Sequence, residues 1–416
     1  MIIMTTITII VTIHNLKPIT TRGIIVSIFP LYLLEGRIQM FDYYDRINIL
    51  MMPTDACNMN CVYCYHEAHF NNTYKMTYDR LEHIMCITLP HFKRVNFIWH
   101  GGEPLLMGKE FYQQVLCLED LHNINNCTIT NSFQSNLTLL TEELADFFVS
   151  NGFTFGTSFD GVENDRTRHS SGEILNGRKI LRQRNSKCGC IMVVSKANIN
   201  TLIESYQFFN ENNIDYKMNS YIKTDNTEVS KMLQLEEKEF VDKMMELYDY
   251  WLTDMHCKIA VNPLMNIVKY ILFNQTFSCS QKSCLGKWLA IRSDGTITNC
   301  NRFFYPQYEY GNVDNYSDIR EAFDSDGFKN ILSKSVERRR KCMTCEIYNY
   351  CSGGCNNVAM FENGIENNGG FSCVTKRKML NYIKQSIDGL KKKDITELEK
   401  WINPKVLKLI MEYQGN

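Results

Sequence analysis

Short apolar runs alternate with amphipathic stretches from about residue 47 to residue 221. The apolar runs have the length and the β-branched or aromatic content of buried strands. An alternation of strands with helical stretches predicts a parallel sheet. The predicted strands are Ile47–Met52, Arg94–Trp99, Cys127–Phe133, Thr154–Phe159, Cys190–Val194 and Tyr216–Tyr221.

The stretches between these strands repeat apolar residues at helical spacing. Six strands are too few for an eight-stranded barrel, so the pattern predicts an incomplete (β/α)6 barrel of the TIM type. Its active-site groups are expected at the carboxyl ends of the strands. The predicted helices are Thr77–Leu89, Lys109–Leu121, Thr141–Asn151, Ser171–Gln183 and Asn200–Asn212, followed by a longer helix over Glu236–Asp254.

Changes in composition divide the chain into four predicted segments. Residues 1–39 are rich in Ile and Thr, and they would form two edge strands, a small recognition element or an extension from an upstream start codon. This segment is too short for a full winged-helix peptide-recognition domain. Residues 40–255 would form the barrel, and residues 377–416 a basic amphipathic helical tail. Residues 256–376 show little periodicity from about residue 277 onward, so we expect metal to hold this segment together.

Charge and cysteine content narrow the classes of function. The 45 Lys and Arg residues balance 46 Asp and Glu residues, so no global charge attracts nucleic acid or an anionic membrane. No convincing secretory signal and no apolar run of membrane-spanning length occur. We therefore expect a cytoplasmic protein, in which the 17 cysteines are more readily metal ligands than disulfides.

Three cysteines follow the first predicted strand closely, at the spacing C-x3-C-x2-C. They are Cys57, Cys61 and Cys64. Three thiolates on one short loop can hold three irons of a 4Fe-4S cluster and leave the fourth iron open for a ligand. The alternative is a zinc knuckle, which the position of the loop directly after a strand disfavours.

At this triad, with Tyr63 just before the last cysteine, the chain resembles the radical S-adenosylmethionine (radical SAM) superfamily. The resemblance implies that the open iron binds the amino and carboxylate groups of S-adenosylmethionine. It also implies that one electron from the cluster breaks the sulfonium bond and yields a 5'-deoxyadenosyl radical. The cofactor then abstracts hydrogen, while the protein supplies orientation and excludes solvent.

Three further motifs are similar to those of the family. Gly101-Gly102-Glu103-Pro104 ends the second strand, Gln134-Ser135-Asn136-Leu137 ends the third, and Ser158 lies two residues before Asp160 at the end of the fourth. The family has glycine where this chain has Leu137. Arg168 is expected to clamp a carboxylate. The resemblance implies this set of residues around S-adenosylmethionine: Tyr63, Gly101, Gly102, Glu103, Pro104, Gln134, Ser135, Asn136, Ser158 and Arg168.

Eight cysteines in the C-terminal third are enough for two more 4Fe-4S clusters. Their order looks like the SPASM domain of radical SAM maturases. The resemblance implies that auxiliary cluster one takes Cys279, Cys284, Cys300 and Cys355, and that auxiliary cluster two takes Cys342, Cys345, Cys351 and Cys373. A zinc ribbon at Cys342, Cys345, Cys351 and Cys355 is the alternative. The other six cysteines are expected to pack in the core: Cys86, Cys117, Cys127, Cys188, Cys190 and Cys257.

The family resemblance implies a net two-electron oxidation of a peptide or protein, with a reductant such as flavodoxin or ferredoxin. The product is a thioether or carbon–carbon crosslink in a ribosomally made peptide, or formylglycine from Cys or Ser in a sulfatase. Sulfatase maturases have Asp where this chain has Asn301, and an amide cannot accept the substrate proton. We therefore rank peptide crosslinking first.

The catalytic base remains open, and the candidates are Asp160 and Tyr305, with Tyr308 and Glu309 nearby. A non-catalytic electron carrier with three clusters is a third hypothesis. The Gly101–Pro104 motif and Ser158 disfavour it, because an electron carrier needs no pocket for S-adenosylmethionine.

Overall fold

The fold is built on one open sheet of ten strands, ordered β12-β11-β10-β3-β4-β5-β6-β7-β8-β9 among the residues that the computed structural model describes. These are residues 33–34, 37–38, 45–64, 74–223, 227–279, 281 and 284–415, with only the backbone of 33–34 and 37–38. From β10 through β9 all neighbouring strands are parallel. The strands are β3 (Arg46–Met52), β4 (Arg94–Trp99), β5 (Thr128–Ser135), β6 (Thr154–Ser158), β7 (Cys188–Val194), β8 (Tyr216–Ser220), β9 (Val261–Asn262), β10 (Trp288–Arg292), β11 (Thr296–Thr298) and β12 (Gly311–Asn312).

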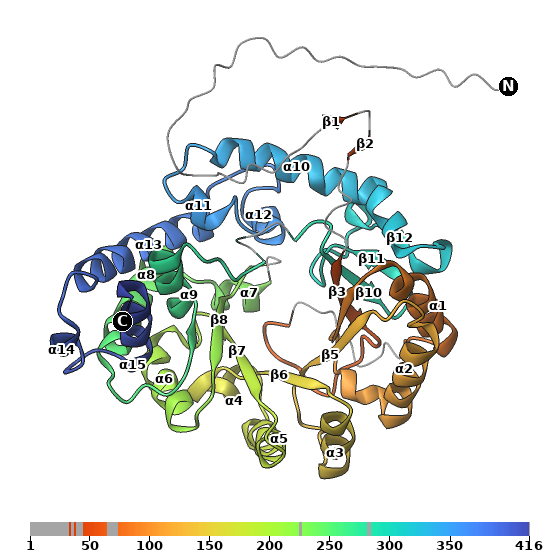
Figure 1. The fold of residues 1–416 in the computed structure, drawn as a ribbon, viewed down its shortest axis with the longest axis horizontal. Helices are drawn as coiled ribbons and strands as arrows, with labels where there is room; N and C mark the ends of the chain where they lie inside the picture. Colours follow the sequence, from red (N-terminus) through yellow and green to blue (C-terminus); the bar gives the residue numbers. More distant parts are fainter. Residues whose placement is uncertain are drawn as a thin grey trace, which may run out of the picture.

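Helices line the outside of the curved sheet, and the C-terminal third closes its open side (Figure 1). The predicted α/β class and partial barrel are confirmed, and β3 to β8 match the six predicted strands. The barrel helices are α1 (Tyr78–Thr88), α2 (Lys109–His122), α3 (Glu142–Ser150), α4 (Asn164–Thr167), α5 (Ser171–Gln183), α6 (Leu202–Glu211), α7 (Glu228–Leu233), α8 (Glu237–Thr253) and α9 (Leu264–Phe273). The later helices are α10 (Asp326–Cys342), α11 (Tyr348–Cys351), α12 (Asn356–Glu362), α13 (Phe371–Leu390), α14 (Ile395–Leu398) and α15 (Pro404–Gln414).

Four strands outside the predicted six extend the sheet, with β10, β11 and β12 at one edge and β9 at the other. β10 comes from the cysteine-rich segment and pairs in parallel with β3, with Leu289 opposite Ile49. β9 pairs with β8 at the other edge. The boundary expected after residue 255 therefore lies within a continuous sheet, and the division into domains stays a prediction.

Residues 277–376 contain more regular structure than the sequence indicates. The longest element there is α10, whose buried face follows helical spacing through Phe328, Ile331, Ser335, Arg338 and Cys342. Two of these five buried side chains are polar, so a hydrophobic pattern does not reveal the helix. The C-terminal tail also differs from the prediction, because α13, α14 and α15 replace a single helix and Pro404 begins the last of them.

Burial corrects the prediction for two cysteines. Cys127, Cys188, Cys190 and Cys257 are buried as expected, but Cys86 on α1 and Cys117 on α2 are exposed. The buried face of α1 consists of Leu81, Ile84, Met85, Ile87 and Thr88, so Cys86 lies on the opposite face. The helical period decides their exposure.

The segment expected to precede the barrel, residues 1–39, falls mostly outside the described residues. Within it, β1 (Leu33–Leu34) and β2 (Arg37–Ile38) pair with each other in an antiparallel ladder separate from the main sheet. Among the described residues no helix is both long and apolar enough to cross a membrane.

A buried carboxylate on α2 makes the stability of the fold depend on pH. Glu119 accepts two hydrogen bonds from Asn131 Nδ2, at 2.9 and 3.1 Å, and Asn131 in turn accepts one from Trp99 Nε1. Burial raises the pKa of Glu119 to about 7. The unfolded chain has the ordinary, lower pKa, so the folded state binds more protons between the two values and stability falls as the pH rises there.

Replacing Glu119 with Gln is expected to weaken this pH dependence. Between pH 6 and pH 7.5 the wild-type protein should lose about 1 kcal/mol of stability through this group, and E119Q should not lose that amount. Urea unfolding followed by tryptophan fluorescence at the two pH values measures the difference. An identical pH dependence in both proteins would contradict the raised pKa.

Candidate functional site

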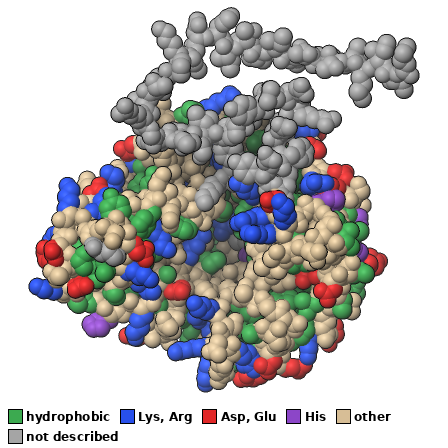
Figure 2. Space-filling view, viewed as in Figure 1, with side chains coloured by type: hydrophobic (Ala, Val, Ile, Leu, Met, Phe, Trp, Pro, Cys, Tyr) green, Lys and Arg blue, Asp and Glu red, His purple; other side chains and the backbone are tan. Residues whose placement is uncertain are grey.

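One pocket of about 410 Å³ lies where the strands β3 to β8 end and the C-terminal third faces them. In the view of Figure 1 the space-filling surface is hollowed over the middle of the sheet, with Lys and Arg side chains beside the hollow (Figure 2). Most of the predicted site residues line this pocket: Cys57, Cys61, Tyr63, Cys64, Gly101, Gly102, Glu103, Gln134, Ser135, Asn136, Ser158, Arg168 and Tyr305. Pro104 and Asp160 are not among the described residues that line it.

The cysteine loop leaves β3 and forms one wall of the pocket. The backbone N–H of Met59 donates to Cys57 Sγ at 3.4 Å, and the N–H of Cys64 donates to the carbonyl of Cys61 at 3.0 Å. Burial first, and then the charges of Glu103, Cys61 and Cys64, raise the pKa of the Cys57 thiol to about 11, against the opposing effect of the Met59 hydrogen bond. The three thiols therefore lie within electrostatic reach of one another, and a metal must displace a proton to bind Cys57.

The glycines after β4 let its backbone contact the start of the cysteine loop. The N–H of Gly102 donates to the carbonyl of Thr54 at 3.1 Å, and that of Glu103 to the carbonyl of Ala56 at 2.8 Å. A Cβ on Gly102 would lie 2.0 Å from the Ala56 oxygen, so only glycine fits there. The segment after β4 is thus joined to the cysteine loop at its base.

Glu103 is a fully buried carboxylate at this junction. Oε1 accepts from Leu105 N–H at 3.0 Å and from the Ser135 hydroxyl at 2.8 Å, while Oε2 accepts from Asn136 N–H at 2.8 Å. Burial raises its pKa, and the hydrogen bonds oppose the rise. These donors fix the carboxylate in a position where it can accept a hydrogen bond from a ligand ammonium.

The ends of β5 and β6 supply the next polar groups. Gln134 Nε2 donates to Ser158 Oγ at 2.9 Å, and Asn136 Nδ2 donates to Asn58 Oδ1 in the cysteine loop at 2.9 Å. Leu137 has a φ of 63°, a left-handed conformation that favours glycine. The backbone here thus has the conformation that glycine would adopt most readily, although the residue is leucine.

Asp160 holds Tyr63 in place. The Tyr63 hydroxyl donates to Asp160 Oδ2 at 2.6 Å and accepts from Arg168 at 2.9 Å, and the Thr167 hydroxyl also donates to Oδ2 at 2.6 Å. Asp160 is completely buried and its other oxygen accepts from Val193 N–H at 2.9 Å. Because its oxygens already accept three hydrogen bonds, the geometry gives Asp160 a positioning role, and a catalytic role stays untested.

The C-terminal third forms the opposite wall, with residues that the sequence analysis mostly did not single out. Asn301 Nδ2 lies 3.4 Å from Nε2 of His100, whose Nδ1 accepts from Gly101 N–H at 2.6 Å. Burial, and then Arg302, lower the pKa of His100 to about 4, so the ring is neutral at neutral pH. The other residues missed include Tyr221 after β8, together with Arg292, Arg302, Phe304 and Phe361. Only the position of Tyr221 at a strand end was a usable signal.

The auxiliary cysteines form two groups in the described structure. Cys284 interacts electrostatically with Cys355 and Cys279, and Cys300 with Cys355 and Cys284. Cys342 interacts with Cys373, Cys351 and Cys345 in the same way. These groups coincide with the two predicted ligand sets, although the ligand roles themselves are untested.

The distances between the side chains of these cysteines can be compared with those that a single zinc ion in a knuckle or a ribbon requires. Among the described residues no three His, Cys, Asp or Glu side chains converge closely enough to hold one metal ion. A tetrahedral zinc site needs such convergence, whereas each iron of a cluster takes only one of the thiolates.

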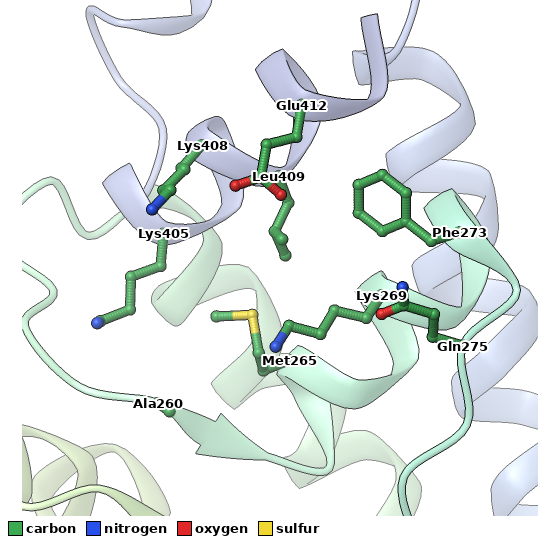
Figure 3. A pocket seen from close by; sticks show the side chains of 9 residues that line it. All are labelled: Ala260, Met265, Lys269, Phe273, Gln275, Lys405, Lys408, Leu409 and Glu412. Atoms are coloured by element: carbon green, nitrogen blue, oxygen red, sulfur yellow. The ribbon is translucent and has the colours of Figure 1, made fainter. Parts of the chain in front are cut away.

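A second pocket of about 400 Å³ lies apart from this chemistry, between α9 and α15. Figure 3 shows Lys269, Lys405 and Lys408 around this pocket, with Leu409 on α15 above it and Met265 on α9 below it in the view. No thiol lines it among the described residues, so it is not a candidate for a cluster.

Comparison with known families agrees with this geometry. A model of the radical SAM superfamily matches residues 51–209, and a model of the SPASM iron-sulfur cluster-binding domain matches residues 279–346. The chain carries a radical SAM domain followed by a SPASM domain. With these two domains the chain is an S-adenosylmethionine-dependent iron-sulfur enzyme.

Relatives of this chain include anaerobic sulfatase-maturating enzymes of the cysteine type and of the serine type. It is 25% identical over 345 residues to the cysteine-type anaerobic sulfatase-maturating enzyme of Clostridium novyi, covering 77% of this chain and 91% of that protein. It is 25% identical over 323 residues to the serine-type enzyme of Klebsiella aerogenes, covering 74% of this chain and 79% of that protein.

Solved structures share the fold. The structure of anSMEcpe with bound AdoMet has a TM-score of 0.74 at 21% identity, covering 83% of this chain and 99% of that one. Streptococcus suis SuiB bound to its precursor peptide SuiA has a TM-score of 0.57 at 18% identity, covering 78% of this chain and 75% of that one.

The residues of the pocket fit these cofactors. Three thiols on one wall suit a cluster with one open iron, and Glu103 suits an ammonium group. Arg168 also lines the pocket, and its Nε is buried without a hydrogen-bond partner among the described residues. Such a donor suits the carboxylate of S-adenosylmethionine.

Proposed function

We propose that this enzyme oxidises a cysteine side chain of a protein substrate to an aldehyde, as a maturase of the sulfatase-maturating type. One pocket joins the S-adenosylmethionine side, at Glu103 and Cys57, to Asn301 beside the auxiliary ligand Cys300, and this observation carries the proposal. A substrate carbon in the pocket can thus lie near both sites. The long matches to cysteine-type and serine-type maturases support the same function. These matches favour sulfatase maturation over peptide crosslinking, whereas Asn301 alone placed peptide crosslinking first.

The reaction is a balanced two-electron oxidation. The CH2–SH group of cysteine loses a hydrogen atom from carbon and a proton and an electron from sulfur, and water then replaces sulfur and releases hydrogen sulfide. Held at Cys57, Cys61 and Cys64, a cluster with S-adenosylmethionine would supply the acceptor for the hydrogen atom, and an auxiliary cluster would supply the acceptor for the electron. A reductant such as flavodoxin or ferredoxin supplies the electron that cleaves S-adenosylmethionine.

The need to remove a proton from the substrate side chain favours cysteine over serine as the residue that is oxidised. Among the described residues that line the pocket, Glu103 is the one carboxylate, and its hydrogen bonds hold it at the S-adenosylmethionine side. Asn301 cannot accept a proton, and Nδ1 of the neutral His100 already accepts from Gly101. A thiol with a pKa of about 8.5 can release its proton to water, whereas a serine hydroxyl needs a base.

Sulfatase-derived peptides with Cys, Ser or Ala at the target position test the proposal under anaerobic conditions. We expect aldehyde from the Cys peptide, little from the Ser peptide and none from the Ala control. Replacing Asn301 with Asp should restore a base and raise the rate with the Ser peptide by about 10²-fold.

Crosslinking of a peptide is the second candidate, and Asn301 is the observation that favours it. A thioether or carbon–carbon bond without aldehyde, detected by tandem mass spectrometry of a candidate precursor peptide, would replace the first proposal.

A further inference from the structure

A completely buried cation lies between the two auxiliary thiol groups. Arg338 on α10 is 1% exposed, and its hydrogen bonds within the described part of the chain reach no carboxylate. Its guanidinium donates only to neutral oxygens: Nε to the Gly353 carbonyl at 2.8 Å, Nη1 to the Ile365 carbonyl and Nη2 to Asn356 Oδ1 at 2.5 Å. A buried charge without a counterion is costly, so a partner of opposite charge is expected close by.

The segments that Arg338 binds are those that carry the cluster ligands. Gly353 lies between Cys351, assigned to auxiliary cluster two, and Cys355, assigned to auxiliary cluster one. Asn356 directly follows Cys355, and α10 itself ends at Cys342. The guanidinium is repelled by the neighbouring Arg339, which adds to the need for negative charge, and it interacts favourably with Cys355, Cys342 and Cys351, which are thiols of both groups. A 4Fe-4S cluster with four thiolate ligands carries net negative charge, which supplies the missing counterion.

We propose that Arg338 is a shared counterion of the two auxiliary clusters and raises the reduction potential of both. Reduction adds a negative charge to a cluster, and a nearby buried cation stabilises that charge more than it stabilises the oxidised cluster. One side chain therefore makes both clusters better electron acceptors without favouring either. This suits an enzyme in which the auxiliary clusters accept an electron from the substrate. The inference rests on the two ligand sets and does not depend on which residue is oxidised.

A redox titration of the full-length chain tests this proposal. In protein with Cys57, Cys61 and Cys64 replaced by Ala, the auxiliary clusters alone contribute to the signal, and electron paramagnetic resonance follows their reduction. Replacing Arg338 with Gln should lower the equilibrium constant for reducing each cluster at least tenfold, about 59 mV for a one-electron couple. Replacing Arg338 with Lys keeps the charge and should leave both potentials within that margin.

Asn299 offers a matched control that acts on one cluster. Its Nδ2 donates to Cys284 Sγ at 3.2 Å, and its Oδ1 accepts from the Tyr310 hydroxyl at 3.3 Å. Replacing Asn299 with Asp removes the donor and adds a negative charge beside auxiliary cluster one, so one of the two reduction steps should shift. In contrast to this control, R338Q should shift both reduction steps and R338K should shift neither.

The outcomes separate charge from structure. If R338Q leaves either potential unchanged, or if R338K lowers both as far as R338Q does, the proposal is wrong. If R338Q fails to assemble its clusters, R338K decides: wild-type potentials in R338K support a requirement for the charge. Failure of R338K to assemble them would show that the geometry of arginine matters instead, and it would overturn the proposal.

Discussion

Replacing Cys57, Cys61 and Cys64 with Ala is expected to remove about four of about twelve irons and to abolish formation of 5'-deoxyadenosine. The loop after β3 supplies all the protein ligands expected for the cluster that binds S-adenosylmethionine. The two auxiliary thiol groups lie in the C-terminal third and keep their ligands. Iron and sulfide assays on anaerobically reconstituted protein, together with chromatography of the nucleoside products, measure both effects.

Cys86 and Cys117 provide the matched control, because both are exposed and lie outside every predicted ligand set. Their replacement with Ala should leave iron content and S-adenosylmethionine cleavage unchanged. Zinc as the dominant metal of the wild-type protein would contradict the cluster assignment. Methylthioadenosine as the sole product would indicate different chemistry.

Replacing Glu103 with Gln is expected to weaken S-adenosylmethionine binding by about 10- to 100-fold, or about 1.4–3 kcal/mol. The carboxylate accepts hydrogen bonds at both oxygens, from Leu105, Ser135 and Asn136. A glutamine amide group must place its NH2 against one of these donors, and it also lacks the charge that attracts an ammonium. Anaerobic calorimetry of the reconstituted enzyme measures the dissociation constant.

E119Q is the control for this experiment, because Glu119 is also a buried carboxylate but does not line the pocket. It should bind S-adenosylmethionine as the wild type does. Equal affinities for E103Q and E119Q, with both proteins folded and fully loaded with iron, would remove Glu103 from the binding site.

Local spacing explains why the barrel could be predicted. The repeat of apolar residues that indicates a helix or a strand is contained within a segment of about five to fifteen residues, and buried parallel strands form continuous apolar runs. The same holds for the cysteine triad, whose three thiols lie within eight residues of each other. The exposure of Cys86 was predictable in principle, since the helical period that places Leu81 and Met85 inward places it outward.

Elements whose burial depends on distant partners were missed. β10 is a strand because it pairs with β3, which lies more than 200 residues earlier, as in the pairing of Trp288 with Asn48. α10 buries Ser335 and Arg338, whose polarity hides its inward face. The sequence of β10 does not reveal its pairing with β3, and the sequence of α10 does not reveal that its polar residues are buried.

The sequence by itself determined the class of enzyme, because the cluster ligands and the motifs at strand ends are set by short-range spacing. Only the tertiary structure decided what surrounds them. It placed Asn301 beside His100, 201 residues away, and Arg338 beside loops that carry cysteines of both predicted ligand sets. The physical reason is that hydrogen bonds and burial depend on distance in space, and the folding of the C-terminal third over the sheet fixes those distances.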